Sequence, residues 1–176
     1  MNYLKIASKF FLLLSLLVFQ VSFISGLPAW VSNLNLILLV LILILGFSSY
    51  RRSLMWAMGI GLLFDMYHFT FFGVNTISLL LALYLTNFLL ENLLTNRSLY
   101  TFIFLTIFAS AIFQLNVIFL NLVFGFLKGY EAVYSFSNIF WLDELKKIIV
   151  NVVFIFFLFY VVSFFSKRFK PMFLVK

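Results

Sequence analysis

Asp65 is the residue of this chain with the clearest potential for chemistry, because it lies inside the apolar segment 59–68 (GIGLLFDMYH), which is typical of a membrane helix. A carboxylate at membrane depth costs at least about 2.5–3.5 kcal/mol unless it is protonated, paired or hydrated. Ala57, Gly61 and Asp65 repeat every four residues and therefore share one helix face, which we expect to contact another helix. His68 follows on the same side, nearer the outer surface. We interpret the set as an anchor for packing or partner recognition, with proton handling or ligand binding as the alternative.

The sequence offers little for catalysis or for metal binding. It has one His and no Cys, so a zinc-type ligand set cannot be assembled. Gly59 and Gly61 are not a nucleotide fingerprint, because they follow no strand. Neither a phosphate-binding glycine loop nor a Ser-His-acid set is present. We therefore expect no enzyme, no cofactor and no metal.

A second group of polar residues lies in the apolar stretch 99–127. Ser110, Gln114 and Asn121 are spaced by four and seven residues and form one stripe, while Asn116 lies off it. Intramembrane amides usually form hydrogen bonds across helices, and they could also line a ligand cavity. Packing is the preferred interpretation, and Asn151 in the last apolar stretch is a similar case.

Composition identifies the solvent of this chain as a lipid bilayer. The sequence is 65% hydrophobic and 10% charged, with 27 Phe among 176 residues, which is more apolar surface than a soluble domain could cover. The length suits a single integral membrane domain spanning 1–176. The net charge of +7 comes from basic residues at segment ends, which is typical of loops facing anionic lipid and argues against nucleic-acid binding.

The apolar stretches predict an all-α protein of about six transmembrane helices, each needing roughly 20 residues. The expected spans are about 8–27, 34–50, 53–72, 75–92, 99–127 and 145–166. With both termini in the cytoplasm, the inner segments carry nine of the 12 Lys and Arg residues. This distribution predicts an N-in, C-in orientation. Asn75, after the turn at Gly73, is expected to cap the fourth span.

The fifth span is longer than a bilayer requires, since 29 helical residues would extend about 43 Å across a hydrocarbon core of about 30 Å. We expect the following segment, 128–144, to lie at the outer interface. Its aromatic residues form an expected partner surface: Tyr130, Tyr134, Phe136, Phe140 and Trp141. Asp143 and Glu144 should pair with Lys146 and Lys147 within one helical turn, and Glu91 with Arg97 at the inner side.

Residues 59 to about 85 resemble the rod shape-determining MreD family. That family has a Gly-rich segment leading to Leu-x-x-Asp and a Gly about eight residues later, which Gly59, Gly61, Asp65 and Gly73 match. Gln20, late in the first span, also resembles the family. A Pro that usually opens the second span is absent, and Asn33-Leu34-Asn35 stands there instead.

The resemblance implies a non-enzymatic component of the bacterial elongation machinery in the cytoplasmic membrane. Its expected partners are an MreC-like protein, a RodA-like glycosyltransferase, a class B penicillin-binding protein and an MreB-like filament. On this interpretation the chain supports assembly and regulation of side-wall peptidoglycan synthesis through helix contacts.

The MreD-like fold is similar to that of the substrate-binding subunits of energy-coupling-factor vitamin transporters, which gives the alternative function. Those subunits usually carry Ala-x-x-x-Ala on the first span, for docking the coupling subunit. Here Phe11 follows Ala7 at that spacing, which counts against the transport function.

Overall fold

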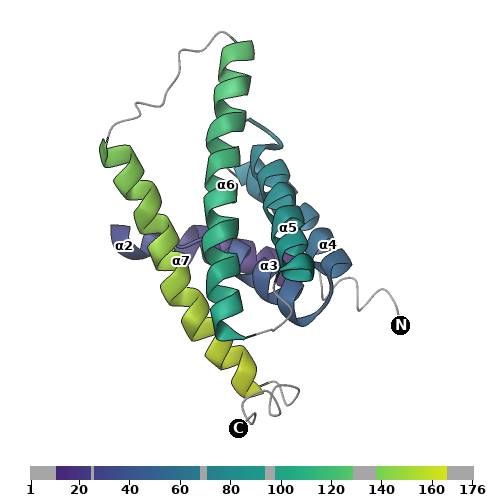
Figure 1. Cartoon of the computed structure of the whole chain (residues 1–176). Coiled ribbons are helices and arrows are strands. Elements are labelled where there is room, and N and C mark those ends of the chain that lie inside the picture. The colour runs from purple at the N-terminus through teal and green to yellow at the C-terminus, as the bar shows by residue number, and fades with distance from the viewer. Residues whose placement is uncertain (1–10, 25, 68–70, 94–97, 129–137, 166–176) are drawn as a thin grey trace.

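The computed structural model of the chain describes residues 11–24, 26–67, 71–93, 98–128 and 138–165 (Figure 1). The first described helix is Phe11–Ile24, whose last part, η1 (Phe19–Ile24), is a π-helix. The remaining helices are α2 (Ala29–Ser32), α3 (Leu36–Phe47), α4 (Tyr50–Tyr67), α5 (Val74–Asn92), α6 (Leu99–Leu127) and α7 (Asn138–Phe165). The described residues contain no strand, so the expected all-α class is confirmed for them.

Three helices are long and apolar enough to cross a membrane: α5, α6 and the part of α7 from Asn138 to Val162. The first helix and α3 are apolar but shorter. The first helix and α3 lie within the predicted spans 8–27 and 34–50, and α4 (Tyr50–Tyr67) overlaps the predicted span 53–72 but begins three residues before it.

Helix α3 lies at the centre of the fold. It contacts α4, α5, α6 and α7, and eight of its 12 residues are buried. Its sequence, LILLVLILILGF, is apolar on every side, which is the composition of a helix surrounded by protein. At about 1.5 Å per residue it is only about 18 Å long. The predicted span 34–50 therefore contains a short, enclosed helix rather than a full lipid-facing one.

Three aromatic rings from three helices pack against one another at the C-terminal end of α3. Phe47 stacks on Phe102 with ring centroids 4.9 Å apart, and Phe159 lies 5.2 Å from Phe102. Gly46 makes this contact possible, because a Cβ on it would lie 2.3 Å from Cζ of Phe102. The cluster joins α3, α6 and α7 through chain positions far apart in sequence.

The long helices α6 and α7 separate toward the N-terminal end of α7 (Figure 1). Helix α7 begins at Asn138, which corrects the expected start of the last span at 145. Phe140 and Trp141 are thus in a helix, because aromatic side chains suited to an interface do not interrupt helical backbone. Lys146 Nζ pairs with Asp143 at 2.7 Å and Lys147 Nζ with Glu144 at 2.6 Å, as the sequence predicts.

Candidate functional site

The carboxylate of Asp65, on α4, caps the N-terminus of α5. Its Oδ1 accepts the backbone N–H of Asn75 at 2.8 Å, and its Oδ2 accepts the backbone N–H of Thr76 at 3.1 Å and the Thr76 hydroxyl. These N–H groups are among the first four of α5, which have no partner inside the helix. Asp65 therefore supplies from a neighbouring helix the bonds that a capping side chain normally supplies locally.

Gly73 explains why the cap comes from elsewhere in the chain. It occupies the N-cap position of α5 with φ 94°, a left-handed conformation that favours glycine, and it has no side chain to accept a hydrogen bond. The expectation that Asn75 is the N-cap is therefore wrong. Asn75 lies inside the first turn of α5, where its backbone N–H donates to Asp65.

Gly61 brings α4 and α5 close enough for these bonds to form. A Cβ on Gly61 would lie 2.8 Å from Cα of Thr76 and 3.0 Å from its Oγ1. Gly61, Asp65 and Thr76 are all buried. Of the face shared by Ala57, Gly61 and Asp65, the last two residues thus lie in the α4–α5 contact, and Ala57 is buried. We call Gly61, Asp65, Gly73 and Thr76 the α4–α5 joint.

The geometry of the joint suits a structural anchor. An ionised carboxylate offers about four acceptor positions, and three donors of α5 engage Asp65. Buried charge is tolerated when such bonds replace water, and the positive end of the α5 dipole favours a negative group. The arrangement fixes the angle and register of α4 against α5.

A second polar cluster forms hydrogen bonds with the backbone of the segment between α2 and α3. Nε2 of Gln20 donates to the Leu34 carbonyl at 2.7 Å, and its Oε1 accepts the Leu36 N–H at 2.8 Å. Oδ1 of Asn151, on α7, accepts the Asn35 N–H at 2.9 Å. These side chains take the place of water at a backbone interruption inside an apolar protein.

Asn35 and Ser110 complete this cluster. Asn35 is the N-cap of α3, and its Oδ1 accepts the Leu38 N–H at 3.0 Å. Nδ2 of Asn151 donates to the Ser110 hydroxyl of α6 at 3.2 Å. The cluster therefore links the first helix, α3, α6 and α7. We call Gln20, Asn35, Ser110 and Asn151 the amide clasp.

The other residues of the predicted polar stripe lie outside the amide clasp. Gln114 and Asn121 are half-buried on α6, and Asn121 has an interaction of its own. Asn116 donates from Nδ2 to the carbonyl of Ile112 within the same helix at 2.8 Å. Of the stripe, Ser110 is the member that bonds to Asn151.

Several predicted residues lie outside the described part of the chain: His68, Arg97, Tyr130, Tyr134 and Phe136. Phe140 is half-buried and Trp141 is 48% exposed, with their ring centroids 5.5 Å apart. Within the described ranges, no three His, Cys, Asp or Glu residues are grouped as they would be to hold a metal ion.

Replacing Asn151 with leucine should test the amide clasp. The change leaves the half-buried Asn35 N–H without the acceptor that Asn151, itself only 1% exposed, provides, so the free energy of unfolding should fall by about 1–3 kcal/mol. Asn116→Leu is the control, because that side chain bonds only to a carbonyl of its own helix, and a change within about 0.5 kcal/mol is expected. Unfolding by sodium dodecyl sulfate in mixed micelles measures both. Equal losses for the two variants would contradict a special role for Asn151.

Thr76 and Asn35 are the site residues that sequence reasoning missed. Asn35 carries a usable signal, since an Asn directly before an apolar run is a typical N-cap. Thr76 carries none, because neither its closeness to Gly61 nor the choice of Asp65 as acceptor for its hydroxyl and backbone N–H can be read from the sequence.

Comparison with known proteins adds no family to this description: no family model matches the chain, and neither a curated protein nor a solved structure shows significant similarity to it.

Proposed function

We propose that this chain is an MreD-like component of the bacterial cell-elongation machinery, which assembles partner proteins in the cytoplasmic membrane through helix contacts. The observation that carries the proposal is the resemblance of residues 59–85 to that family. Gly61, Asp65 and Gly73, which carry much of the resemblance, all take part in the α4–α5 joint. A motif that fixes a helix pair is compatible with a scaffold, whose role is to present surfaces in a defined arrangement.

The surface proposed to meet a partner's transmembrane helix lies where α6 and α7 separate. Exposed apolar side chains line this end of both helices, including Phe119, Phe126, Ile139, Trp141 and Leu142. In a membrane such side chains are compatible with lipid, and their large apolar area and ring geometry also allow them to pack against aromatic side chains of a partner. On this proposal the chain has about six spans with both termini inside, and this end of α6 and α7 faces outward.

The finer fold proposed here is similar to that of energy-coupling-factor substrate-binding subunits, without their transport function. The absent Ala-x-x-x-Ala pair, with Phe11 four residues after Ala7, supports this distinction. The proposed partners remain an MreC-like protein, a RodA-like glycosyltransferase, a class B penicillin-binding protein and an MreB-like filament.

Co-purification with the MreC-like protein of the same genome tests the proposal. The wild-type chain should recover this partner from detergent extracts, and Trp141→Glu should reduce the recovery, because it places a charge in the proposed contact. Tyr100→Glu, at the opposite end of α6 and 82% exposed, is the matched control and should leave recovery unchanged.

Two results would count against the proposal. If the wild-type chain recovers no MreC-like protein while it remains folded, the scaffold function fails. If Trp141→Glu and Tyr100→Glu recover the partner as well as the wild type does, the surface is assigned to the wrong end of the helices.

A further inference from the structure

We propose that the facing polar residues of α6 and α7 bind water at membrane depth, and that this water enters from the end where the two helices separate. The residues are Gln114 on α6 and Glu144 and Lys147 on α7, and we call them the polar seam. Hydration of the seam does not depend on the proposed partners. Only the side of the membrane from which the water enters follows from the proposed orientation.

Two neighbouring ion pairs on α7 differ in their surroundings. The side chains of Asp143 and Lys146 are 52% and 63% exposed, whereas those of Glu144 and Lys147 are 13% and 30% exposed. The Glu144–Lys147 pair is therefore turned toward the protein, and the Asp143–Lys146 pair is turned away from it.

The inward pair lies on the face of α7 that meets α6. Glu144, Lys147 and Asn151 are spaced by three and four residues and share this face, and Asn151 donates to the Ser110 hydroxyl of α6. Gln114 follows Ser110 by four residues and is half-buried on the same face of α6. The two helices run in opposite directions and separate beyond this contact (Figure 1). The seam thus extends from the amide clasp toward the separated end.

The seam contains hydrogen-bonding groups that the protein does not fully use. Oε1 of Glu144 accepts from Nζ of Lys147 at 2.6 Å, but none of the described residues donates to its buried Oε2. A lysine ammonium has three N–H donors, and this bond uses one of them. Polar groups without partners are costly in an apolar medium. The medium beside the seam must therefore supply both a donor and an acceptor.

Water meets this requirement and an acyl chain does not. A water molecule donates and accepts hydrogen bonds, and ionisable residues within membrane spans typically face the protein interior or a water-filled space. Lys147 could instead reach the membrane surface through its long side chain. Gln114 has no such route, because it precedes the end of α6 at Leu127 by 13 positions, or about 20 Å. Gln114 is therefore the position that reports water at depth.

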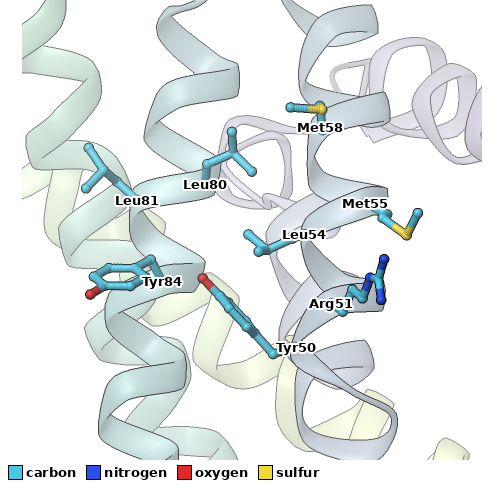
Figure 2. A pocket seen from close by; sticks show the side chains of 8 residues that line it. All are labelled: Tyr50, Arg51, Leu54, Met55, Met58, Leu80, Leu81 and Tyr84. Atoms are coloured by element: carbon cyan, nitrogen blue, oxygen red, sulfur yellow. The ribbon is translucent and has the colours of Figure 1, made fainter.

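The groove between α4 and α5 shows the contrasting case of a lipid-compatible surface. Apolar side chains such as Leu54, Met58 and Leu80 line most of it, and the Arg51 side chain is directed away from the Tyr50 hydroxyl (Figure 2). Acyl chains can cover such a surface without leaving buried polar groups unpaired, which they cannot do at the polar seam.

Cysteine accessibility in the membrane tests the hydration of the seam directly, because the chain has no Cys of its own. Gln114→Cys should react with the membrane-impermeant thiol reagent MTSET, since the reactive thiolate forms in water. Leu115→Cys is the matched control: this neighbour is 55% exposed on the apolar surface of α6 and should react at least about a hundredfold more slowly. Equal rates for the two variants would overturn the proposal.

Gly125→Cys, near the end of α6, identifies the side from which water enters, because its added side chain meets nothing within 4 Å. Gln114→Cys should react from the same side as Gly125→Cys, and reaction only from the opposite side would contradict entry at the separated end. If both variants react only from the cytoplasmic side, the seam is hydrated and the proposed orientation is wrong.

A pair of double variants tests whether the inward ion pair keeps the seam hydrated. Glu144→Leu with Lys147→Leu should slow the reaction of Gln114→Cys about tenfold, because an apolar lining excludes water. Asp143→Leu with Lys146→Leu removes the same two charges from the exposed pair and should change the rate by less than about twofold. Equal effects of the two double variants would show that the inward pair has no special part in hydration, and the proposal would fail.

Discussion

Asp65→Ala should lower the free energy of unfolding by about 3–5 kcal/mol, among the largest losses expected for a single substitution in this chain. The change leaves the N–H groups of Asn75 and Thr76 without acceptors in a site where Asp65 is only 3% exposed. Neither water nor Gly73 can supply replacement acceptors, since the site is buried and Gly73 has no side chain.

Asp65→Asn should have a smaller effect, of about 1–3 kcal/mol. The amide oxygen of Asn can still accept a hydrogen bond from one donor of α5. The amide nitrogen, however, is itself a donor, and it would face the other donors of α5, which then lack an acceptor. The order wild type, Asn, Ala in unfolding by sodium dodecyl sulfate is therefore the expected signature of a cap. An Asn variant as stable as the wild type would contradict it, because the carboxylate would then contribute nothing that an amide does not.

The matched control for this series is Thr86→Val, on the same helix α5. The Thr86 hydroxyl is fully buried but donates to the carbonyl of Ala82 in its own turn. Its removal orphans no backbone group, so a loss of less than about 1 kcal/mol is expected. In cells, the scaffold function predicts that Asp65→Ala gives shorter, rounder cells, and a normal shape despite loss of stability would separate the cap from the proposed role.

The face of α4 that meets α5 could be predicted from sequence, but the bonds formed there could not. Small residues at Ala57 and Gly61, followed by Asp65 at the same spacing, identify a face that favours close helix approach. The partners of Asp65 are mostly backbone N–H groups of α5, and every residue has such a group. Sequence patterns therefore predict that Asp65 needs a partner without indicating which one.

Helix lengths were less predictable than helix positions, for two different reasons. The stretch 34–50 is apolar enough for a lipid-facing span, yet hydropathy alone does not distinguish lipid from surrounding helices, and α3 is enclosed by four of them. The stretch 138–144 combines Trp141 with Asp143 and Glu144. This composition is typical of a segment at the membrane–water interface, and it is equally compatible with the end of a helix that projects from the membrane. Ser110 and Asn151 could be identified from sequence as single polar residues that need partners. Their grouping in the amide clasp could not be predicted, since Asn151 and Asn35 are 116 positions apart.

Gly61→Ala should destabilise the fold by about 1–3 kcal/mol through overpacking, although alanine is the better helix former. The added Cβ would lie 2.8 Å from Cα of Thr76, which is backbone and cannot rotate away. Helix α5 must therefore move, and the movement also lengthens the bonds from its first turn to Asp65.

Gly59→Ala is the control that separates crowding from helix propensity. Its Cβ would meet only Cδ1 of Leu13, at 3.3 Å, the far end of a flexible side chain that can shift. Gly125→Ala meets nothing within 4 Å. Both should be neutral or stabilising by up to about 1 kcal/mol, because alanine loses less backbone entropy than glycine. The sign of the change in unfolding free energy thus distinguishes crowding from helix propensity. A loss for Gly61→Ala with no loss for Gly59→Ala and Gly125→Ala indicates that Gly61 contacts α5. A gain at all three would mean that α4 and α5 do not approach each other as closely as the joint requires.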